Sequence, residues 1–171
     1  AAHPGNRQVY SEVNELIENL DPKDVRPVID AIQHLPNPRE RNTFMSMLIA
    51  RWAEGDARGA VDYAQSENAA GEGWLVAEVV GTWAEHDSAA AMAWVTQTPP
   101  GSERNGALQS LVSALVEKDP QGAFSFLQAL PAADQTAALY SPIFSGWGSA
   151  DPVTAGQVAL QLPSGPIRDM A

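Results

Sequence analysis

The sequence predicts an all-α fold, an α-solenoid in which helical hairpins of about 32 residues follow one another along the chain. Aspartates recur at a nearly constant spacing, and alanines and prolines recur at fixed distances behind them. Between these markers, apolar residues follow the helical period. The composition agrees with this fold, because 44 % apolar residues suffice for a continuous core and the abundant alanine favours helix.

The aspartates form a ladder with steps of 32, 31, 32 and 32 residues: Asp24, Asp56, Asp87, Asp119 and Asp151. Four residues after each aspartate stands a small apolar residue: Val28, Ala60, Ala91, Ala123 and Ala155. Twelve residues after each comes a residue that favours turns: Pro36, Asn68, Pro99, Pro131 and Pro163. Agreement of all five registers to within one residue predicts tandem units.

Each unit is predicted to hold two helices, here named helix A and helix B. Helix A begins at the aspartate, whose carboxylate can accept hydrogen bonds from the first turn, and the proline of Asp119-Pro120 suits the first helical position. A Leu-Pro pair such as Leu130-Pro131 ends it. One helix-A face is apolar, as in Ala123, Phe124, Leu127 and Leu130.

Helix B follows a short loop and also has a helical apolar period. Its predicted core residues are Phe44, Met45, Leu48, Ile49 and Trp52; Leu75, Val76, Val79, Val80 and Trp83; Ala107, Leu108, Leu111, Val112 and Leu115; and Leu139, Tyr140, Ile143, Phe144 and Trp147. Pro142 inside the last set predicts a kink or break.

The chain is predicted to be a single helical-repeat domain over residues 1–171, with units 24–55, 56–86, 87–118 and 119–150 and partial units 1–23 and 151–171. The segment from Tyr10 to Leu20 has the pattern of a helix B. Because terminal units normally carry a polar cap, the short last unit suggests a longer array or an end covered by another surface, for example by self-association.

These motifs resemble known repeats. The residues that carry the likeness are Trp52-Ala53 with Asp56 and Ala60, Trp83-Ala84 with Asp87 and Ala91, and Asp119-Pro120 with Ala123 and Leu130-Pro131. Over nearly the whole chain the pattern resembles tetratricopeptide and Sel1-type repeats, more loosely HEAT repeats, and bacterial repeats reading W-A-x-x-D-P-x-x-A and then L-P. It departs from the tetratricopeptide repeat in lacking the early Trp-Leu-Gly and in its shorter period. The resemblance implies a right-handed stack of helix pairs that binds proteins or peptides.

The charge pattern excludes some partners. The formal net charge of −11 disfavours nucleic acid and anionic membranes. It favours either a solvated acidic surface or a basic partner. The chain has no cysteine, no apolar run long enough for a membrane span and no signal-peptide pattern, which leaves both a cytosolic and an exported location open.

The sequence predicts no enzyme, no metal site and no cofactor. Carboxylates in successive units could be imagined as acid–base pairs, but helix capping accounts for them. The recurring tryptophans fit a buried core better than a stacking surface for sugars or bases. His3, His34 and His86 lack ligand spacing, and the chain has neither a nucleophile elbow nor a phosphate loop.

A cation recurs at the start of helix B, in Arg41, Arg104 and Arg168. This position is unfavourable for the helix dipole, so the arginines should have another task. They are interpreted as structural salt bridges to a neighbouring unit, or else as clamps for the carboxylate of a peptide terminus.

The candidate binding site is a stripe on helix A, at the second, sixth and ninth positions after the aspartate. Its residues are Arg26, Asp30 and Gln33; Arg58, Asp62 and Gln65; and Gln121, Ser125 and Gln128. The small residues at the third position, Gly59, Ala90, Gly122 and Thr154, are expected to allow close helix approach. The preferred hypothesis is a non-catalytic scaffold that binds a protein or peptide on the concave helix-A face. The alternatives are a plain solvated face, an assembly subunit of a larger complex and, least favoured, an enzyme.

Overall fold

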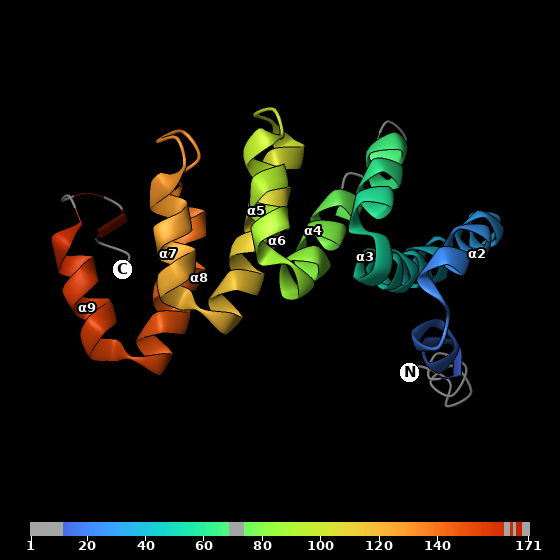
Figure 1. Ribbon diagram of the computed structural model, residues 1–171, viewed down its shortest axis with the longest axis horizontal. Coiled ribbons are helices and arrows are strands. Elements are labelled where there is room, and N and C mark those ends of the chain that lie inside the picture. The colour runs from blue at the N-terminus through green and yellow to red at the C-terminus, as the bar shows by residue number, and fades with distance from the viewer. Residues whose placement is uncertain (1–11, 69–73, 163–164, 166, 169–171) are drawn as a thin grey trace. The chain divides into compact units, whose positions relative to one another are not determined.

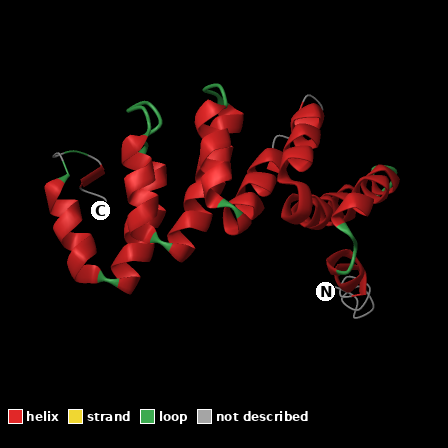
Figure 2. Ribbon diagram, viewed as in Figure 1, coloured by secondary structure: helices red, strands yellow, loops and turns green. Residues whose placement is uncertain are grey.

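A computed structural model describes residues 12–68, 74–162, 165, 167 and 168, and that part of the chain is helical and contains no strand (Figure 2). Residues 12–18 form a first helix. The elements that follow are η1 (Pro22–Asp24), α2 (Val25–Ile32), α3 (Pro38–Asn68), α4 (Trp74–His86), α5 (Ser88–Gln97), α6 (Ser102–Lys118), α7 (Pro120–Ala129), α8 (Ala137–Ala150) and α9 (Pro152–Gln161) (Figure 1). An all-α fold is therefore confirmed. The chain divides into two compact units, residues 1–79 and residues 80–171, and α4 contributes to both.

The first unit is built around α2 and α3, which pack against each other. Its core holds Val25 and Ile29 from α2 and Leu48 and Ile49 from α3, all with no exposed surface. α3 is interrupted at Asp56, whose φ of −144° and ψ of 75° are not helical, so a helix B (38–55) passes directly into a helix A (57–68). A predicted helix boundary at Asp56 is thereby confirmed.

In the second unit, each helix from α5 to α9 packs against the next one in the chain, and α6 also packs against α8 (Figure 1). All the predicted helix-B core positions of α4, α6 and α8 are buried, as are the predicted apolar positions of α7. The predicted buried tryptophans are confirmed: Trp52, Trp83 and Trp147 are between 5 and 8 % exposed.

Single aspartates join helix B to the following helix A. At Asp87, Asp119 and Asp151, φ lies between −143° and −152° and ψ between 81° and 87°. Each carboxylate accepts a hydrogen bond from the amide three residues later, at 2.9 to 3.1 Å. Each aspartate amide donates to a carbonyl of the preceding helix at 2.7 or 2.8 Å. Asp56 caps Gly59 in the same way at 2.9 Å. The capping role is confirmed at these four positions.

Asp24 is the exception, and the prediction that it caps helix A is wrong. It makes no side-chain cap hydrogen bond, because the helical turn begins earlier, at Pro22. The cap is Asp21, which accepts from the amide of Lys23 at 3.2 Å. Proline after Asp21 suits the first position of a helical turn, so this local signal decides the boundary over the even spacing. Counted from Asp21, the buried Val25 and Ile29 stand at the fourth and eighth positions, as in the other units.

Two further expectations need correction. α8 runs without a break through Pro142, which lies in its second turn, where only one intrahelical hydrogen bond is forgone. The small residues at the third position do not serve helix approach at Gly59 and Gly122, because an added Cβ would meet the capping carboxylate of Asp56 or Asp119. The expectations for His3 and for most of the segment 163–171 lie outside the described residues.

Candidate functional site

The helix-A elements present one side to solvent. Positions four and eight after each capping aspartate are buried, while positions two, six and nine are exposed. The exposed sets are Arg58, Asp62 and Gln65 on α3; Ala89, Ala93 and Thr96 on α5; Gln121, Ser125 and Gln128 on α7; and Val153, Gln157 and Leu160 on α9. On each of these helices, this side is called the helix-A face below. It includes seven of the nine candidate binding residues, namely the six on α3 and α7 and also Asp30 at the ninth position after the capping Asp21, and none of them is buried.

Of Arg26, Asp30 and Gln33, only Asp30 belongs to the same register. Because helix A of the first unit begins at Asp21, they stand at its fifth, ninth and twelfth positions. The fifth position is partly turned toward helix B. The guanidinium of Arg26 accordingly lies over the rings of Trp52 and Tyr63, 6.0 and 5.2 Å from their centroids. On α7, Phe124 stands at the fifth position after Asp119, and the centroid of its ring lies 5.9 Å from that of Trp147. Arg26 thus replaces an aromatic contact with a cation–π contact.

Tyr63 interacts with the first three candidate residues, with Gln33 at its hydroxyl, Arg26 over its ring and Asp30 through charge alone. The amide of Gln33 donates to the Tyr63 hydroxyl at 2.8 Å. Burial raises the pKa of Tyr63, the charges of Glu67 and Asp30 raise it further, and the Gln33 hydrogen bond and Arg26 oppose the rise. Tyr63 therefore stays a neutral hydrogen-bonding group at ordinary pH. The rings of Trp52 and Tyr63 hold the exposed Arg26 in place, and an arginine held in this way suits recognition of a carboxylate or carbonyl.

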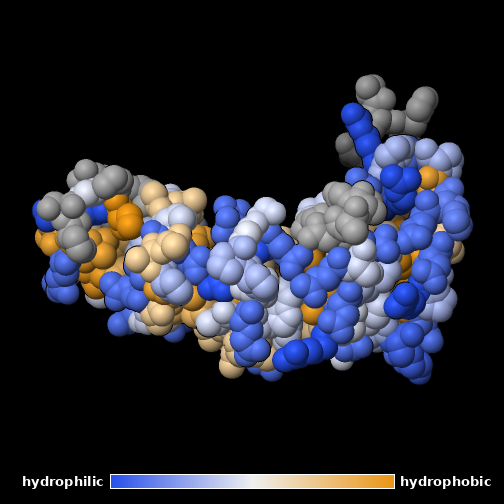
Figure 3. All heavy atoms as spheres, turned by 90° about the horizontal axis from the view of Figure 1, so that it is seen from above, coloured by the Kyte–Doolittle hydropathy of each residue, from blue (hydrophilic) through white to orange (hydrophobic). Residues whose placement is uncertain are grey.

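The candidate residues of α7 are held by local hydrogen bonds. The Ser125 hydroxyl donates to the carbonyl of Gln121 at 2.9 Å, and the Gln128 carbonyl accepts from Gln135 at 3.2 Å. Their side chains remain exposed. The helix-A face becomes apolar at α9, where Val153 and Leu160 are 68 and 72 % exposed and apolar surface gathers at that end of the chain (Figure 3).

Arg104 is a structural residue. Its guanidinium donates to the carbonyls of Thr96 and Thr98 at 2.9 and 2.6 Å and pairs with Asp134 at 2.7 Å. The arginine is only 5 % exposed, so no peptide terminus can reach it. The salt-bridge interpretation is confirmed here and the clamp interpretation is wrong. At the related positions, Arg41 is half-buried and Arg168 is exposed.

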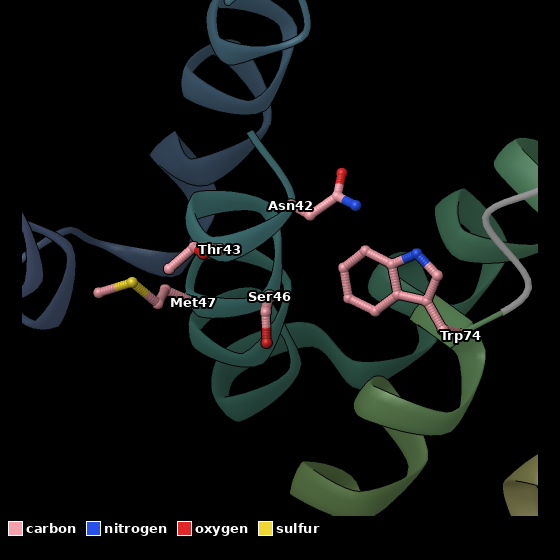
Figure 4. Close-up of a pocket in the computed structure, with 5 residues that line it drawn as sticks. All are labelled: Asn42, Thr43, Ser46, Met47 and Trp74. Carbon is pink, nitrogen blue, oxygen red and sulfur yellow. The ribbon is translucent and has the colours of Figure 1, made fainter. Parts of the chain in front are cut away.

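A shallow hollow of 550 Å³ lies between α3 and the first turn of α4, lined by Asn42, Thr43, Ser46, Met47 and Trp74. The indole of Trp74 faces the side of α3 that carries Asn42 and Ser46 (Figure 4). The Ser46 hydroxyl also donates to Glu78 at 2.9 Å. The five lining side chains are polar or apolar and uncharged.

A second hollow of 370 Å³ in the first unit was missed by the sequence reasoning. Nine apolar side chains line it: Val13, Leu16, Ile17, Leu20, Val28, Ile32, Leu35, Phe44 and Leu48. This apolar groove lies between the helix 12–18, α2 and α3. Phe44, expected in the core, is only half-buried because it forms part of the groove wall. The signal in the sequence was the helix-B pattern of the segment 10–20, whose described apolar residues include Val13, Leu16 and Ile17.

Within the described residues, no three His, Cys, Asp or Glu side chains cluster so as to hold a metal ion. Over the same residues, no helix is both long and apolar enough to cross a membrane.

The chain matches no model of a known protein family, and no curated protein or solved structure is significantly similar to it.

Proposed function

We propose that this chain is a non-catalytic scaffold that binds a segment of another protein through its helix-A face. The observation that supports the proposal is the regular exposure of the second, sixth and ninth positions of helices α5, α7 and α9 and of residues 57–68, beside fully buried fourth and eighth positions. Side chains on such a face point to solvent rather than into the helical core, and a bound segment would contact them there. In the α-solenoid arrangement that the sequence pattern favours, the faces of α5, α7 and α9 in residues 80–171 would line the concave side of that unit.

The chemistry of the helix-A face changes along the chain. It is charged at Arg58 and Asp62, polar and uncharged at Gln121 and Gln128, and apolar at Leu160. Val153 and Leu160, both exposed on α9, would give a bound segment apolar contact. Arg26 adds a cation that Trp52 and Tyr63 hold in place.

The test is a pull-down with the intact chain as bait, compared with two variants. One carries Arg58→Ala, Gln65→Ala and Gln128→Ala on the helix-A face. The matched control carries Gln109→Ala and Ser113→Ala, which are equally exposed but lie on helix B of α6. A partner that binds the intact chain and the control but not the first variant supports the proposal. Equal capture by all three baits contradicts it.

A second candidate function is that of an assembly subunit, favoured by the two exposed apolar residues of α9, Val153 and Leu160. In this case the α9 end would associate with another copy or with a neighbouring subunit. Sedimentation equilibrium tests self-association: a concentration-dependent dimer that Val153→Ser and Leu160→Ser abolish would favour the assembly role. A monomer at all concentrations would leave the scaffold as the better proposal.

A further inference from the structure

The helix that forms one wall of the apolar groove in residues 1–79 also carries several glutamates. The helix 12–18 supplies Val13, Leu16 and Ile17 to the groove. The same helix carries Glu12, Glu15 and Glu18 and no basic residue. A neighbouring hollow of 350 Å³, lined by Glu12, Glu15, Leu16 and Asn19, shares Leu16 with the groove. Apolar contact and negative charge therefore meet along one helix.

Two cations near the helix 12–18, Lys23 and Arg51, already have hydrogen-bond or ion-pair partners within the chain. Lys23 pairs with Asp21 at 2.8 Å. Arg51 donates to the Leu20 carbonyl at 2.8 Å and pairs with Glu54. From residue 12 to residue 24 the chain has five acidic residues and one lysine. The potential on this side of the groove is consequently negative, and it selects for a positively charged partner.

The groove is large enough to hold a few apolar side chains of a partner. Its volume of 370 Å³ is at the lower end of the roughly 300–1,000 Å³ common for binding pockets. Leu16 is 71 % exposed on its rim, although a leucine loses favourable free energy when left in water. Grooves between helices of this kind accept the apolar face of an amphipathic helix.

We propose that the groove between the helix 12–18, α2 and α3 binds an amphipathic helix of another protein, with apolar anchors in the groove and lysines or arginines against Glu15. This site is distinct from the helix-A face, so the two proposals can fail separately. The net charge of −11 further favours a cationic partner by raising its rate of encounter.

The experiment measures fluorescence anisotropy of a fluorescein-labelled helical peptide of leucine and lysine, with the leucines on one face. A second peptide has glutamate in place of each lysine. Because the chain is acidic, general attraction must be separated from groove binding. Leu16→Glu and Leu160→Glu do this, since each adds the same charge at a similarly exposed leucine, one at the groove and one on α9.

The lysine peptide should bind the intact chain, more weakly at high salt, and the glutamate peptide should not. Leu16→Glu should weaken binding at least about tenfold although it adds negative charge, because the loss of one buried leucine contact exceeds the gain in attraction. Leu160→Glu should leave the affinity within about twofold, as should Arg58→Ala with Gln65→Ala. Glu15→Lys should also weaken binding.

Two results would overturn the proposal. Equal retention or an equal gain in Leu16→Glu and Leu160→Glu would mean that the peptide follows net charge alone, and an equal loss would mean that the groove is not the binding site. A dimer of the chain by itself that Leu16→Glu dissociates would identify a second copy as the occupant. Circular dichroism of each variant establishes that the helices remain.

Discussion

Arg104 on α6 and Asp134 in the loop before α8 form an ion pair of 2.7 Å across 30 residues of sequence, with side chains only 6 and 11 % exposed. The pair ties the start of one helix B to the connection that precedes the next. Two threonine carbonyls share the guanidinium, and its Nε has no partner among the described residues. The ion pair therefore depends on the planar fork of an arginine.

Removing one member of this pair should be costly. We expect Asp134→Ala to lower the free energy of unfolding by about 3 kcal/mol, because it leaves a buried guanidinium without its counter-charge. Glu117→Ala, which removes an exposed carboxylate of the same unit, should change it by less than about 0.5 kcal/mol. Urea unfolding followed by circular dichroism measures both. The double variant Arg104→Met with Asp134→Leu should be less destabilised than the sum of the single changes, and simple additivity would contradict a coupled pair.

The aspartate caps can be compared directly with the aspartate that does not cap. Asp119→Ala removes the acceptor for the Gly122 amide, so we expect a loss of about 1 kcal/mol in unfolding free energy. Asp24→Ala removes an exposed aspartate that has no cap hydrogen bond and should cost almost nothing. Denaturant titration of the two variants measures the difference. Equal losses would mean that helix A of the first unit does begin at Asp24.

Two glycines of α8 should respond to alanine in opposite directions. An added Cβ at Gly146 would lie 2.4 Å from Cγ1 of Val116 on α6, and a valine side chain cannot turn away easily. Gly146→Ala should therefore destabilise the protein by about 1–3 kcal/mol. Gly148 has open space around the same position, so Gly148→Ala should stabilise it by about 0.5–1 kcal/mol through the backbone entropy of the unfolded chain. Thermal unfolding of both variants tests the packing of α6 on α8.

The cap at Asp151 should make stability depend on pH in the acid range. Hydrogen bonds from the Thr154 side chain and backbone hold the pKa of Asp151 below its usual value of 3.8. Its contribution is thus complete above that value and is lost as the pH falls through the lower pKa of the folded state. Asp151→Asn should remove this part of the pH dependence, whereas Asp62→Asn, which changes an exposed aspartate that caps no helix, should not. Unfolding in urea at a series of acid pH values distinguishes the two.

The sequence predicted those parts of the structure that depend on residues close together in the chain. The buried positions of helix B and the caps at Asp87, Asp119 and Asp151 follow from helical period and from the chemistry of an aspartate before a helix. The register of the first unit was mistaken because even spacing favoured Asp24, while the proline after Asp21 sets the true start. As a result, Arg26 was assigned to the solvent-facing stripe and is found over Trp52 and Tyr63 instead.

The apolar groove could not be predicted from period alone. Leu16 and Phe44 have the spacing of core residues, and whether such residues are covered depends on which helix lies over them. That is a property of the tertiary structure. The pairing of Arg104 with Asp134 was predicted in kind, but its partner could not be named from sequence, because Asp134 lies in an irregular loop.

The two kinds of helix connection should differ in how they respond to inserted residues. A junction of a single aspartate has no length to spare, whereas a longer loop does. Between α6 and α7 the whole change of direction is made by Asp119, so one inserted residue would turn α7 by about 100° and expose Ala123 and Leu127. Between α7 and α8 the chain has several residues in which to absorb an added length. An engineer who wished to graft an epitope or a fluorophore-binding loop would place it in this connection, would keep Asp134 in its ion pair with Arg104, and would leave the junction aspartates untouched.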